Sequence, residues 1–200
     1  VLLSGGIEST TVLHMEYEAG TDITPLFVDY AQRGAEMERQ ACRAVCETLS
    51  LELVEMDASG IGGGFRALQG KRRLHVPVPH RNLLILSIAL SLASQQQARA
   101  IVLALQADDG AWYPSASPSF VESFTHTAAT LEPQIAFEAP LRAMRKPDVI
   151  RAGAALHVDF ARSYSCMLGG ELHCGTCRQC LDRRAAFLEA DIPDPTLYAA

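Results

Sequence analysis

The sequence predicts an α/β fold in which a parallel five-stranded sheet carries helices on both faces and a small lobe follows at the C-terminus. Two observations predict it. Short apolar segments alternate with segments of helical periodicity over most of the chain. Such alternation is typical of parallel sheets covered by helices on both faces. In addition, four of the six cysteines fall between residues 166 and 180, which sets the C-terminal end apart.

The predicted elements follow one another in a regular order. Five short apolar segments are predicted strands: residues 1–3, 23–28, 51–56, 100–105 and 135–137. Helical periodicity covers residues 9–20, 35–49, 81–97 and 119–131, and a further helix is predicted within 141–164. In a sheet of this kind, ligands bind at the carboxyl ends of the strands.

Residues 58–79 interrupt this order. They contain glycines at positions 60, 62, 63 and 64 and end in Val-Pro-Val-Pro, so we predict a long loop near the ligand-binding edge of the sheet. The basic run Lys71-Arg72-Arg73 within this segment is interpreted as a solvated stretch and not as a phosphate clamp.

Composition narrows the class of protein. The 200 residues suffice for one domain, or for one domain with a small lobe. The net charge of −6 provides no overall basic field for nucleic acid. The longest apolar run, residues 83–93, is shorter than the ~20 residues that span a bilayer, and it indicates a buried helix. We therefore expect a cytoplasmic protein without a membrane partner and without direct contact to nucleic acid.

The loop after the first predicted strand has the character of an anion site. It reads Ser4-Gly5-Gly6-Ile7-Glu8-Ser9-Thr10. The glycines let backbone N–H groups approach a ligand, and the following helix offers unpaired N–H groups and the positive end of its dipole. The alternative is a tight turn with Ser9 as helix cap. Because the loop directly follows the first strand and carries several hydroxyl groups, phosphate binding is favoured.

The cysteine cluster predicts a structural metal site. Cys166, Cys174, Cys177 and Cys180 supply four thiolates, the number that a closed tetrahedral zinc site needs. An iron–sulfur cluster would use the same ligands and is ranked below zinc, and disulfides are ranked lower still. His173 could replace one cysteine, although its adjacency to Cys174 makes joint ligation awkward. Cys42 and Cys46 are interpreted as buried core thiols.

The loop resembles a motif of known enzymes. Ser-Gly-Gly-x-acid-Ser/Thr at the end of a first strand is similar to the pyrophosphate loop of the N-type ATP pyrophosphatases, which adenylate their substrates. This resemblance implies a Rossmann-like nucleotide-binding domain of the adenine nucleotide alpha hydrolase type, here residues 1–160, with the zinc-binding lobe over residues 161–200. The usual acid of the motif is Asp, and this chain has Glu8, whose extra methylene moves the carboxylate outward.

Four further segments resemble one branch of that superfamily, the 7-cyano-7-deazaguanine synthases. LFVDYAQRGAEMERQA (residues 26–41) is similar to the family segment FxDYGQRHxxE, and VPVPHRNLLILSIALSLA (residues 76–93) is similar to its VPxRN helix start. MRKPDVIRAG (residues 144–153) and CRQCLDRRAAFLEADIPDPTLY (residues 177–198) match the C-terminal half. Together with the loop and the cysteines, the resemblance covers nearly the whole chain.

The resemblance implies a reaction and a set of site residues. The family converts 7-carboxy-7-deazaguanine, ammonia and ATP to the nitrile with Mg²⁺, and its members suggest a homodimer with structural Zn²⁺. Lys146, Arg81 and Asp29 are the catalytic candidates. The residues expected to bind nucleotide or substrate are Ser4, Gly5, Gly6, Glu8, Ser9, Thr10, Tyr30, Gln32, Asn82, Asp109 and Tyr113.

One segment departs from the family pattern. After the fourth strand the family carries Asp and then SGYPDCRPEF, whereas this chain has QADDGAWYPSASPSF, with Ser115-Ala116-Ser117 in place of Asp-Cys-Arg. Small neutral residues there imply a changed or enlarged acceptor pocket, and with Glu8 they point to a divergent paralogue. Two alternatives to nitrile synthesis follow. The adenylated acyl group is transferred to another amine, for example on a protein, or the chain is a non-catalytic nucleotide-binding partner.

Overall fold

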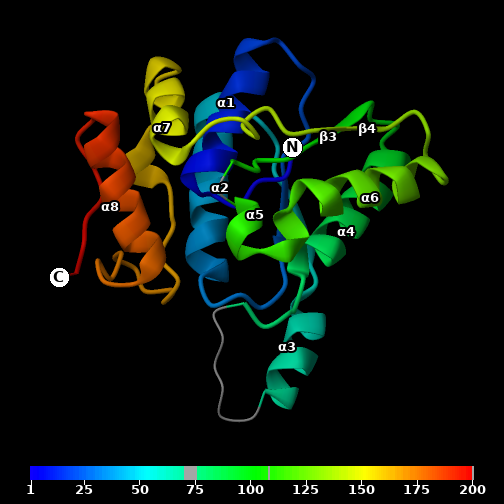
Figure 1. Cartoon of the computed structure of the whole chain (residues 1–200), viewed down its shortest axis with the longest axis horizontal. Coiled ribbons are helices and arrows are strands. Elements are labelled where there is room, and N and C mark those ends of the chain that lie inside the picture. Colours follow the sequence, from blue (N-terminus) through cyan, green and yellow to red (C-terminus); the bar gives the residue numbers. More distant parts are fainter. Residues whose placement is uncertain (70–75, 108, 200) are drawn as a thin grey trace.

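The computed structural model describes residues 1–69, 76–107 and 109–199, so the basic run Lys71-Arg72-Arg73 lies outside the described residues. The helices are α1 (Ile7–Glu18), α2 (Ala35–Leu49), α3 (Ser59–Leu68), α4 (Arg81–Gln95), α5 (Asp109–Trp112), α6 (Pro118–Ala129), α7 (Lys146–Ala155) and α8 (Arg178–Ala190), with 3₁₀ turns at Pro114–Ala116 and Phe160–Arg162. The strands are β1 (Leu26–Asp29), β2 (Val54–Asp57), β3 (Ala100–Val102) and β4 (Ala136–Glu138). The mixed α/β class is confirmed (Figure 1).

The strands pair in parallel, as predicted, but as two two-stranded sheets. Leu26 of β1 lies opposite Val54 of β2, and Ala100 of β3 lies opposite Ala136 of β4. The predicted five-stranded sheet is not seen, because residues 1–3 form only an isolated bridge. This segment nevertheless lies between the two sheets. Leu2 donates a hydrogen bond to the carbonyl oxygen of Val102 (3.0 Å), and its bridge partner is Leu26.

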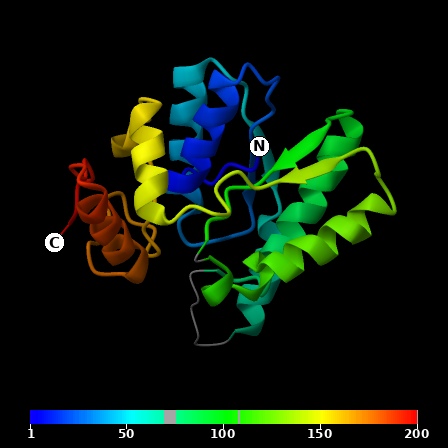
Figure 2. The same ribbon diagram turned by 45° about the horizontal axis from the view of Figure 1, so that its top comes forward.

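Helices cover both faces of these strands. Successive side chains of a strand point to opposite faces. Phe27 of β1 packs with Leu13 of α1 and Cys42 of α2, whereas Leu26 belongs to a cluster that includes Leu86 of α4. In both ribbon views, α1, α2 and α7 lie together and α4 and α6 lie beside β3 and β4 (Figures 1 and 2). The buried positions of Cys42 and Cys46 confirm their predicted place in the core.

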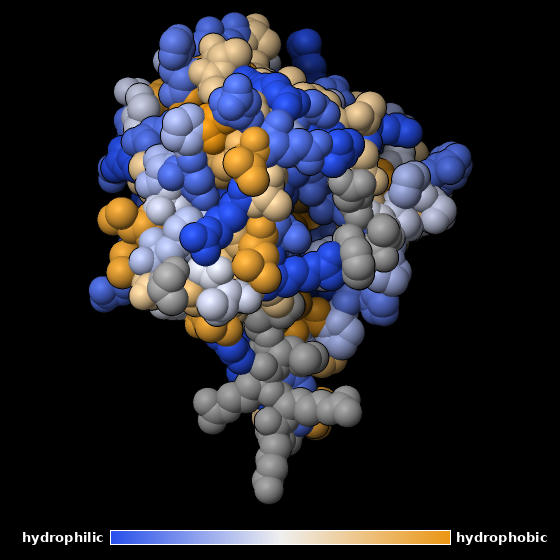
Figure 3. Space-filling model, turned by 60° about the vertical axis from the view of Figure 1, so that its left-hand side comes forward, coloured by the Kyte–Doolittle hydropathy of each residue, from blue (hydrophilic) through white to orange (hydrophobic). Residues whose placement is uncertain are grey.

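The C-terminal helix joins the same body through α7. Val12 of α1, Ile150 of α7 and Phe187 of α8 form one buried cluster, so the three helices pack in series. On the side of the molecule turned forward in Figure 3, hydrophobic side chains lie scattered among hydrophilic ones. Within the described parts of the chain, no helix combines the length and the apolar character needed to cross a membrane.

The predicted long loop over residues 58–79 is wrong in its first half, because residues 59–68 form helix α3. Ile61, Phe65 and Leu68 follow helical spacing within the glycine-rich sequence, and all three are exposed. At position 62, the fold itself requires a glycine. It lies against the backbone of Tyr30, and a Cβ atom at Gly62 would approach the Tyr30 carbonyl oxygen to 1.8 Å. The glycine therefore permits a close contact between α3 and the segment that follows β1.

Replacing Gly62 with Ala should destabilise the protein, because the added methyl group would have to push α3 away from Tyr30. Forcing extra volume into a packed site costs about 1–3 kcal/mol of unfolding free energy. Gly63 is the matched control, since a Cβ atom there meets nothing within 4 Å. Gly63→Ala should leave stability unchanged or raise it, because alanine favours the helix. Equal melting temperatures for the two variants would contradict this account of Gly62.

Candidate functional site

A cavity of about 830 Å³ lies where the loop after residue 3 meets α4, α7 and α8. It borders the carboxyl ends of β1 and β3, where the fold class places ligands. The structure brings most of the predicted site residues together in its wall. These are Ser4, Gly6, Glu8, Ser9, Tyr30, Gln32, Arg81, Asn82, Asp109, Tyr113 and Lys146.

The loop before α1 is held in a closed form by its own hydroxyl groups. The backbone N–H of Ser4 donates to Ser9 Oγ (3.1 Å), and the two hydroxyl oxygens lie 3.1 Å apart. Helix α1 begins at Ile7, and its cap residue Gly6 provides no side-chain hydrogen bond. The first N–H groups of the helix therefore depend on a ligand or water, which makes this helix end suitable for a phosphate.

The two glycines of the loop have different roles. Gly5 has a φ of +72°, and a Cβ atom there would lie 2.7 Å from Ala41 Cβ and 2.8 Å from the Glu38 carbonyl oxygen. The fold itself therefore requires glycine at position 5. A Cβ atom at Gly6 would meet protein atoms no closer than 3.6 Å. Gly6 lines the cavity, and a methyl group at this position would fit among the protein atoms.

Gly6→Ala should therefore keep the fold and weaken nucleotide binding. The added methyl group fits the protein but occupies space beside the helix N-terminus, where a phosphate would contact backbone N–H groups. We expect at least a tenfold loss of ATP affinity in calorimetry, with an unchanged melting temperature. Gly5→Ala should instead lower the melting temperature. Unaltered ATP binding by Gly6→Ala would exclude the loop as the phosphate site.

Glu8, Lys146 and Asp109 form a charged cluster in the cavity wall. Lys146 begins α7, and its Nζ lies 3.0 Å from Glu8 Oε1. Burial opposes the charge of Lys146, but Glu8 and Asp109 outweigh it and raise the pKa of the ammonium group. Burial, with the nearby Glu8, raises the pKa of Asp109. Glu8, which is one methylene longer than the usual Asp of the motif, thus forms an ion pair with Lys146.

A second group of polar residues lines the cavity at the start of α4. The guanidinium of Arg81 lies over the ring of Tyr113, 4.7 Å from its centroid. Burial raises the pKa of Tyr30, and the nearby Arg81, which shares a hydrogen bond with it, partly offsets that effect. Asn82 donates from Nδ2 to the carbonyl oxygen of Ser115 (2.8 Å), so its amide positions the segment after α5.

Ser115, Ala116 and Ser117, which replace the Asp-Cys-Arg of the family pattern, have two different structural roles. Ser115 and Ala116 are buried and line the cavity. Ser117 instead caps α6: its Oγ accepts the backbone N–H of Phe120 (3.2 Å) and donates to the Pro114 carbonyl oxygen (2.9 Å). Two of the three positions thus shape the ligand space, and the third begins a helix.

Three predicted site residues do not line the cavity. Gly5 packs against α2, as described above. Thr10 borders a separate, small cavity of about 30 Å³ together with His14. Asp29 accepts the backbone N–H of Ala31 (2.9 Å) and forms an ion pair with Arg39. These partners account for its carboxylate, so the position of Asp29 favours a role in the fold over contact with a ligand.

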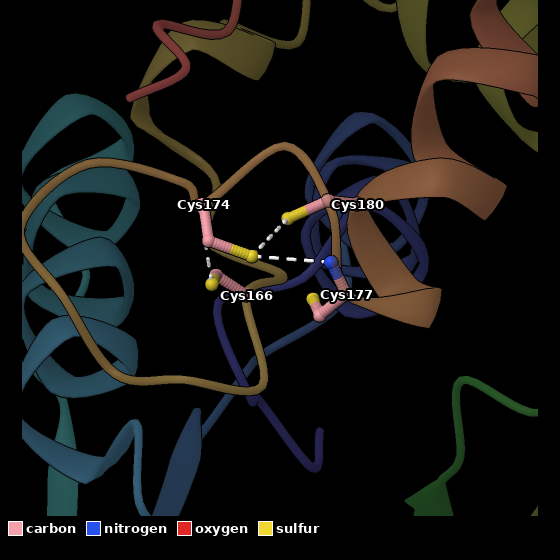
Figure 4. Close-up of side chains that lie close together, drawn as sticks. All are labelled: Cys166, Cys174, Cys177 and Cys180. Atoms are coloured by element: carbon pink, nitrogen blue, oxygen red, sulfur yellow. Dashed lines mark hydrogen bonds between the residues drawn. The ribbon is translucent and has the colours of Figure 1, made fainter. Parts of the chain in front are cut away.

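The four clustered cysteines form a compact metal-ligand set (Figure 4). All four are free thiols, and their sulfur atoms lie within 4.8 Å of one another. A tetrahedral zinc site with Zn–S bonds of about 2.3 Å separates its sulfurs by about 3.8 Å. Cys174 and Cys180 approach that spacing, with their sulfurs 3.9 Å apart. Backbone N–H groups of Thr176 and Cys177 lower the pKa of Cys174 to about 6, which favours the thiolate.

His173 does not belong to this ligand set. Its Nε2 accepts the backbone N–H of Ser165 (3.0 Å), and its ring packs between Tyr164 and Tyr198. Burial, together with the charge of Arg183, lowers the pKa of His173 to about 4, so the ring is neutral at pH 7. The histidine considered as a substitute ligand is therefore part of the packing around the cluster.

The comparison with known families agrees with this geometry. A family model described as "Queuosine biosynthesis protein QueC" matches residues 1–191. The match includes the Ser4 loop, Lys146 and all four clustered cysteines. The chain belongs to the QueC family.

Curated relatives share one name and nearly the full length of the QueC-family chain. A 7-cyano-7-deazaguanine synthase of Methanoculleus marisnigri is 35% identical over an alignment of 215 positions, covering 98% of this chain and 96% of the relative. The synthase of Nitrosospira multiformis is also 35% identical, with coverage of 100% and 94%. The synthase of a Ruegeria species is 32% identical, with coverage of 100% and 92%.

The cavity also contains residues that sequence reasoning missed. Glu38 lies in a segment whose family pattern places its glutamate at position 37, where this chain has Met37, so the pattern did not single it out. Others come from the C-terminal half of this QueC-family chain and were assigned only to the zinc lobe or to matching segments. They are Arg145, Tyr164, Arg178, Asp182 and Glu189.

Proposed function

We propose that this protein adenylates 7-carboxy-7-deazaguanine and converts it, with ammonia and two ATP molecules, to 7-cyano-7-deazaguanine. One observation carries the proposal. The phosphate loop, the cationic residues Lys146 and Arg81, and the segment at Ser115 all line one cavity. Its volume of about 830 Å³ is within the range of small-molecule sites. Family membership and the shared name of the relatives support the same activity.

The residues fit a mechanism of positioning and charge stabilisation. In the first step, a carboxylate oxygen of the substrate attacks the α-phosphorus of ATP, and pyrophosphate leaves to give an acyl adenylate. Ser4, Gly6 and Ser9 would hold the leaving pyrophosphate. Lys146, held in its charged form by Glu8, would neutralise the negative charge that develops on it. Arg81, which lines the cavity at the start of α4, provides a second cation.

The later steps reuse the same site. Ammonia attacks the acyl carbon and AMP leaves, which gives the amide after loss of a proton. The amide oxygen then attacks a second ATP and pyrophosphate leaves. Loss of AMP and of the remaining N–H protons yields the nitrile. Glu8 and Asp109 supply carboxylate oxygens, the ligand type that Mg²⁺ prefers, and the ion would offset phosphate charge.

The proposal assigns zinc a structural role. Four cysteine ligands leave no open position, so the metal would stabilise the residues around Cys166 and Cys180 without touching the substrate. The same proposal includes a cytoplasmic homodimer, which rests on resemblance to the family alone. Light scattering of the purified protein tests the dimer.

Mass spectrometry of the products tests the activity. The protein is incubated with ATP, Mg²⁺, the deazaguanine acid and ammonia, and we expect the free nitrile together with AMP and pyrophosphate. Pyrophosphate release with a conjugate to another amine, or nucleotide binding without turnover, would replace the proposal by one of the two alternatives. The common name of the relatives does not favour either alternative.

A further inference from the structure

Glu38 is a half-buried carboxylate in the cavity wall that the proposed steps do not use. It lies on α2, and its side chain belongs to the cavity lining together with Gln32 and Tyr164. Carboxylates are rarely buried unless donors surround them. Burial raises the pKa of Glu38, and the hydrogen bond from Gln32 and the nearby charge of Arg81 only partly offset this effect. Among the described residues, Gln32 is the one hydrogen-bond donor to the Glu38 carboxylate. The side chain thus has more acceptor capacity than the protein fills.

Gln32 holds this carboxylate in place. The Nε2 group of Gln32 donates to Glu38 Oε2 (2.8 Å) and to the Val28 carbonyl oxygen (3.3 Å). Its Oε1 accepts the backbone N–H of Tyr30 (2.9 Å). Both donor hydrogens and the oxygen of the amide are therefore engaged by the protein. Gln32 acts as a positioning residue, and Glu38 is the group left to meet a ligand.

The other carboxylate oxygen lies beside Gly34. A Cβ atom at Gly34 would lie 3.2 Å from Glu38 Oε1, 3.2 Å from the ring of Tyr164 and 3.5 Å from the carbonyl oxygen of Cys166. The family segment carries His at this position, and the glycine of this chain lets Oε1 and the Tyr164 ring pack close to the backbone. Among the described residues, no hydrogen bond to Glu38 Oε1 is found.

We propose that Glu38 recognises the amino-pyrimidinone edge of the substrate, with Gln32 fixing the carboxylate. This inference rests on the proposed function. The edge carries a ring N–H and an exocyclic amine, two adjacent donors that match the two oxygens of a carboxylate. A carboxylate oxygen has more than one lone pair, so the bond from Gln32 leaves Oε2 able to accept again. Hydrogen bonds to a charged acceptor are among the stronger ones.

The first test compares two glutamates of α2. Glu38→Gln keeps the size of the side chain and an acceptor for Gln32, but it removes the charge and places an N–H₂ group against the donors of the ligand. Glu36→Gln is the matched control, because Glu36 is exposed and outside the cavity. We expect Glu38→Gln to raise KM for the acid at least tenfold with little change in KM for ATP, and Glu36→Gln to behave as the parent.

The second test compares the acid with an analogue that lacks the exocyclic amine, in the parent and in Glu38→Gln. The parent should use or bind this analogue at least tenfold more weakly than the acid, because one acceptor is left unpaired. Glu38→Gln should lose most of that discrimination. Melting temperature and zinc content of the variant establish that it is folded.

The outcomes separate this inference from the proposed function. If the parent forms the nitrile but treats acid and analogue alike, or if Glu38→Gln discriminates as the parent does, the assignment of Glu38 is overturned and the function stands. If the parent forms no nitrile, calorimetry with the acid and the analogue decides. Binding that depends on Glu38 and on the amine supports the assignment, and binding independent of them, or no binding, overturns it.

Discussion

Chelation of the metal should unfold the residues around the cysteine cluster and abolish turnover. Zinc binding supplies about 10–16 kcal/mol of apparent free energy in small zinc-finger peptides. Because the site forms only in the folded state, this binding energy stabilises the fold. Without the ion, four sulfur atoms within 4.8 Å of one another would be left in a partly buried site. Among the described residues, the turns from Cys166 to Cys177 contain no strand or helix of their own.

Elemental analysis, circular dichroism and limited proteolysis with and without chelator measure the effect. We expect about one zinc per chain, and proteolytic cleavage between residues 166 and 180 after its removal. Cys180→Ser should reproduce the loss. Cys46→Ser is the control, because Cys46 is a buried free thiol outside the cluster. It should retain the zinc. A zinc-free protein with the parent's melting curve, or disulfides among the four cysteines, would refute the structural zinc site.

Lys146→Met should lower the rate of pyrophosphate release at least a hundredfold. The variant keeps the length of the side chain but removes the cation that is held beside Glu8 and Asp109. Removing one preorganised charge from an active site commonly costs about 10²–10³ in turnover. The two carboxylates would then repel the phosphates of ATP, so we also expect weaker ATP binding.

The control for this variant lies on the same helix. Arg151 is exposed on α7 and pairs with Asp148, one turn along, so Arg151→Met removes a cation that does not face the cavity. It should retain turnover close to that of the parent. Pyrophosphate release is measured at saturating ATP and acid. If Lys146→Met keeps more than a tenth of the parental rate, Lys146 does not have the proposed role.

Local patterns made the helices and the metal ligands predictable. The bounds of α2 agree with the predicted residues 35–49, because its apolar positions repeat at helical spacing. The cysteines could be grouped because all four ligands are close in sequence. Helix α3 was missed because its four glycines favour a loop more strongly than its three spaced apolar residues favour a helix. The contact between Gly62 and Tyr30, which explains one of these glycines, exists only in the folded chain.

The site was less predictable where a side chain's partner is distant in sequence. Asp29, the last residue of β1, was expected to meet the ligand, but Arg39 on the following helix α2 forms an ion pair with it. Glu38, in contrast, was not predicted as a site residue but lines the cavity. Nothing in its own sequence context distinguishes it from the exposed Glu36, and only the hydrogen bond from Gln32 shows which glutamate enters the cavity. Tertiary packing, not periodicity, makes that choice.

The position of residues 1–3 between the two sheets determines when this fold can close. Leu2 bridges to Leu26 on one side and donates a hydrogen bond to Val102 on the other, so residues 1–3 are held in place only when a partner about a hundred residues further along the chain is also in place. Contacts of such long sequence separation slow folding, because the intervening chain loses entropy before the contact forms. The phosphate loop that follows residue 3 is therefore expected to assemble late in folding, because its anchor depends on this distant contact.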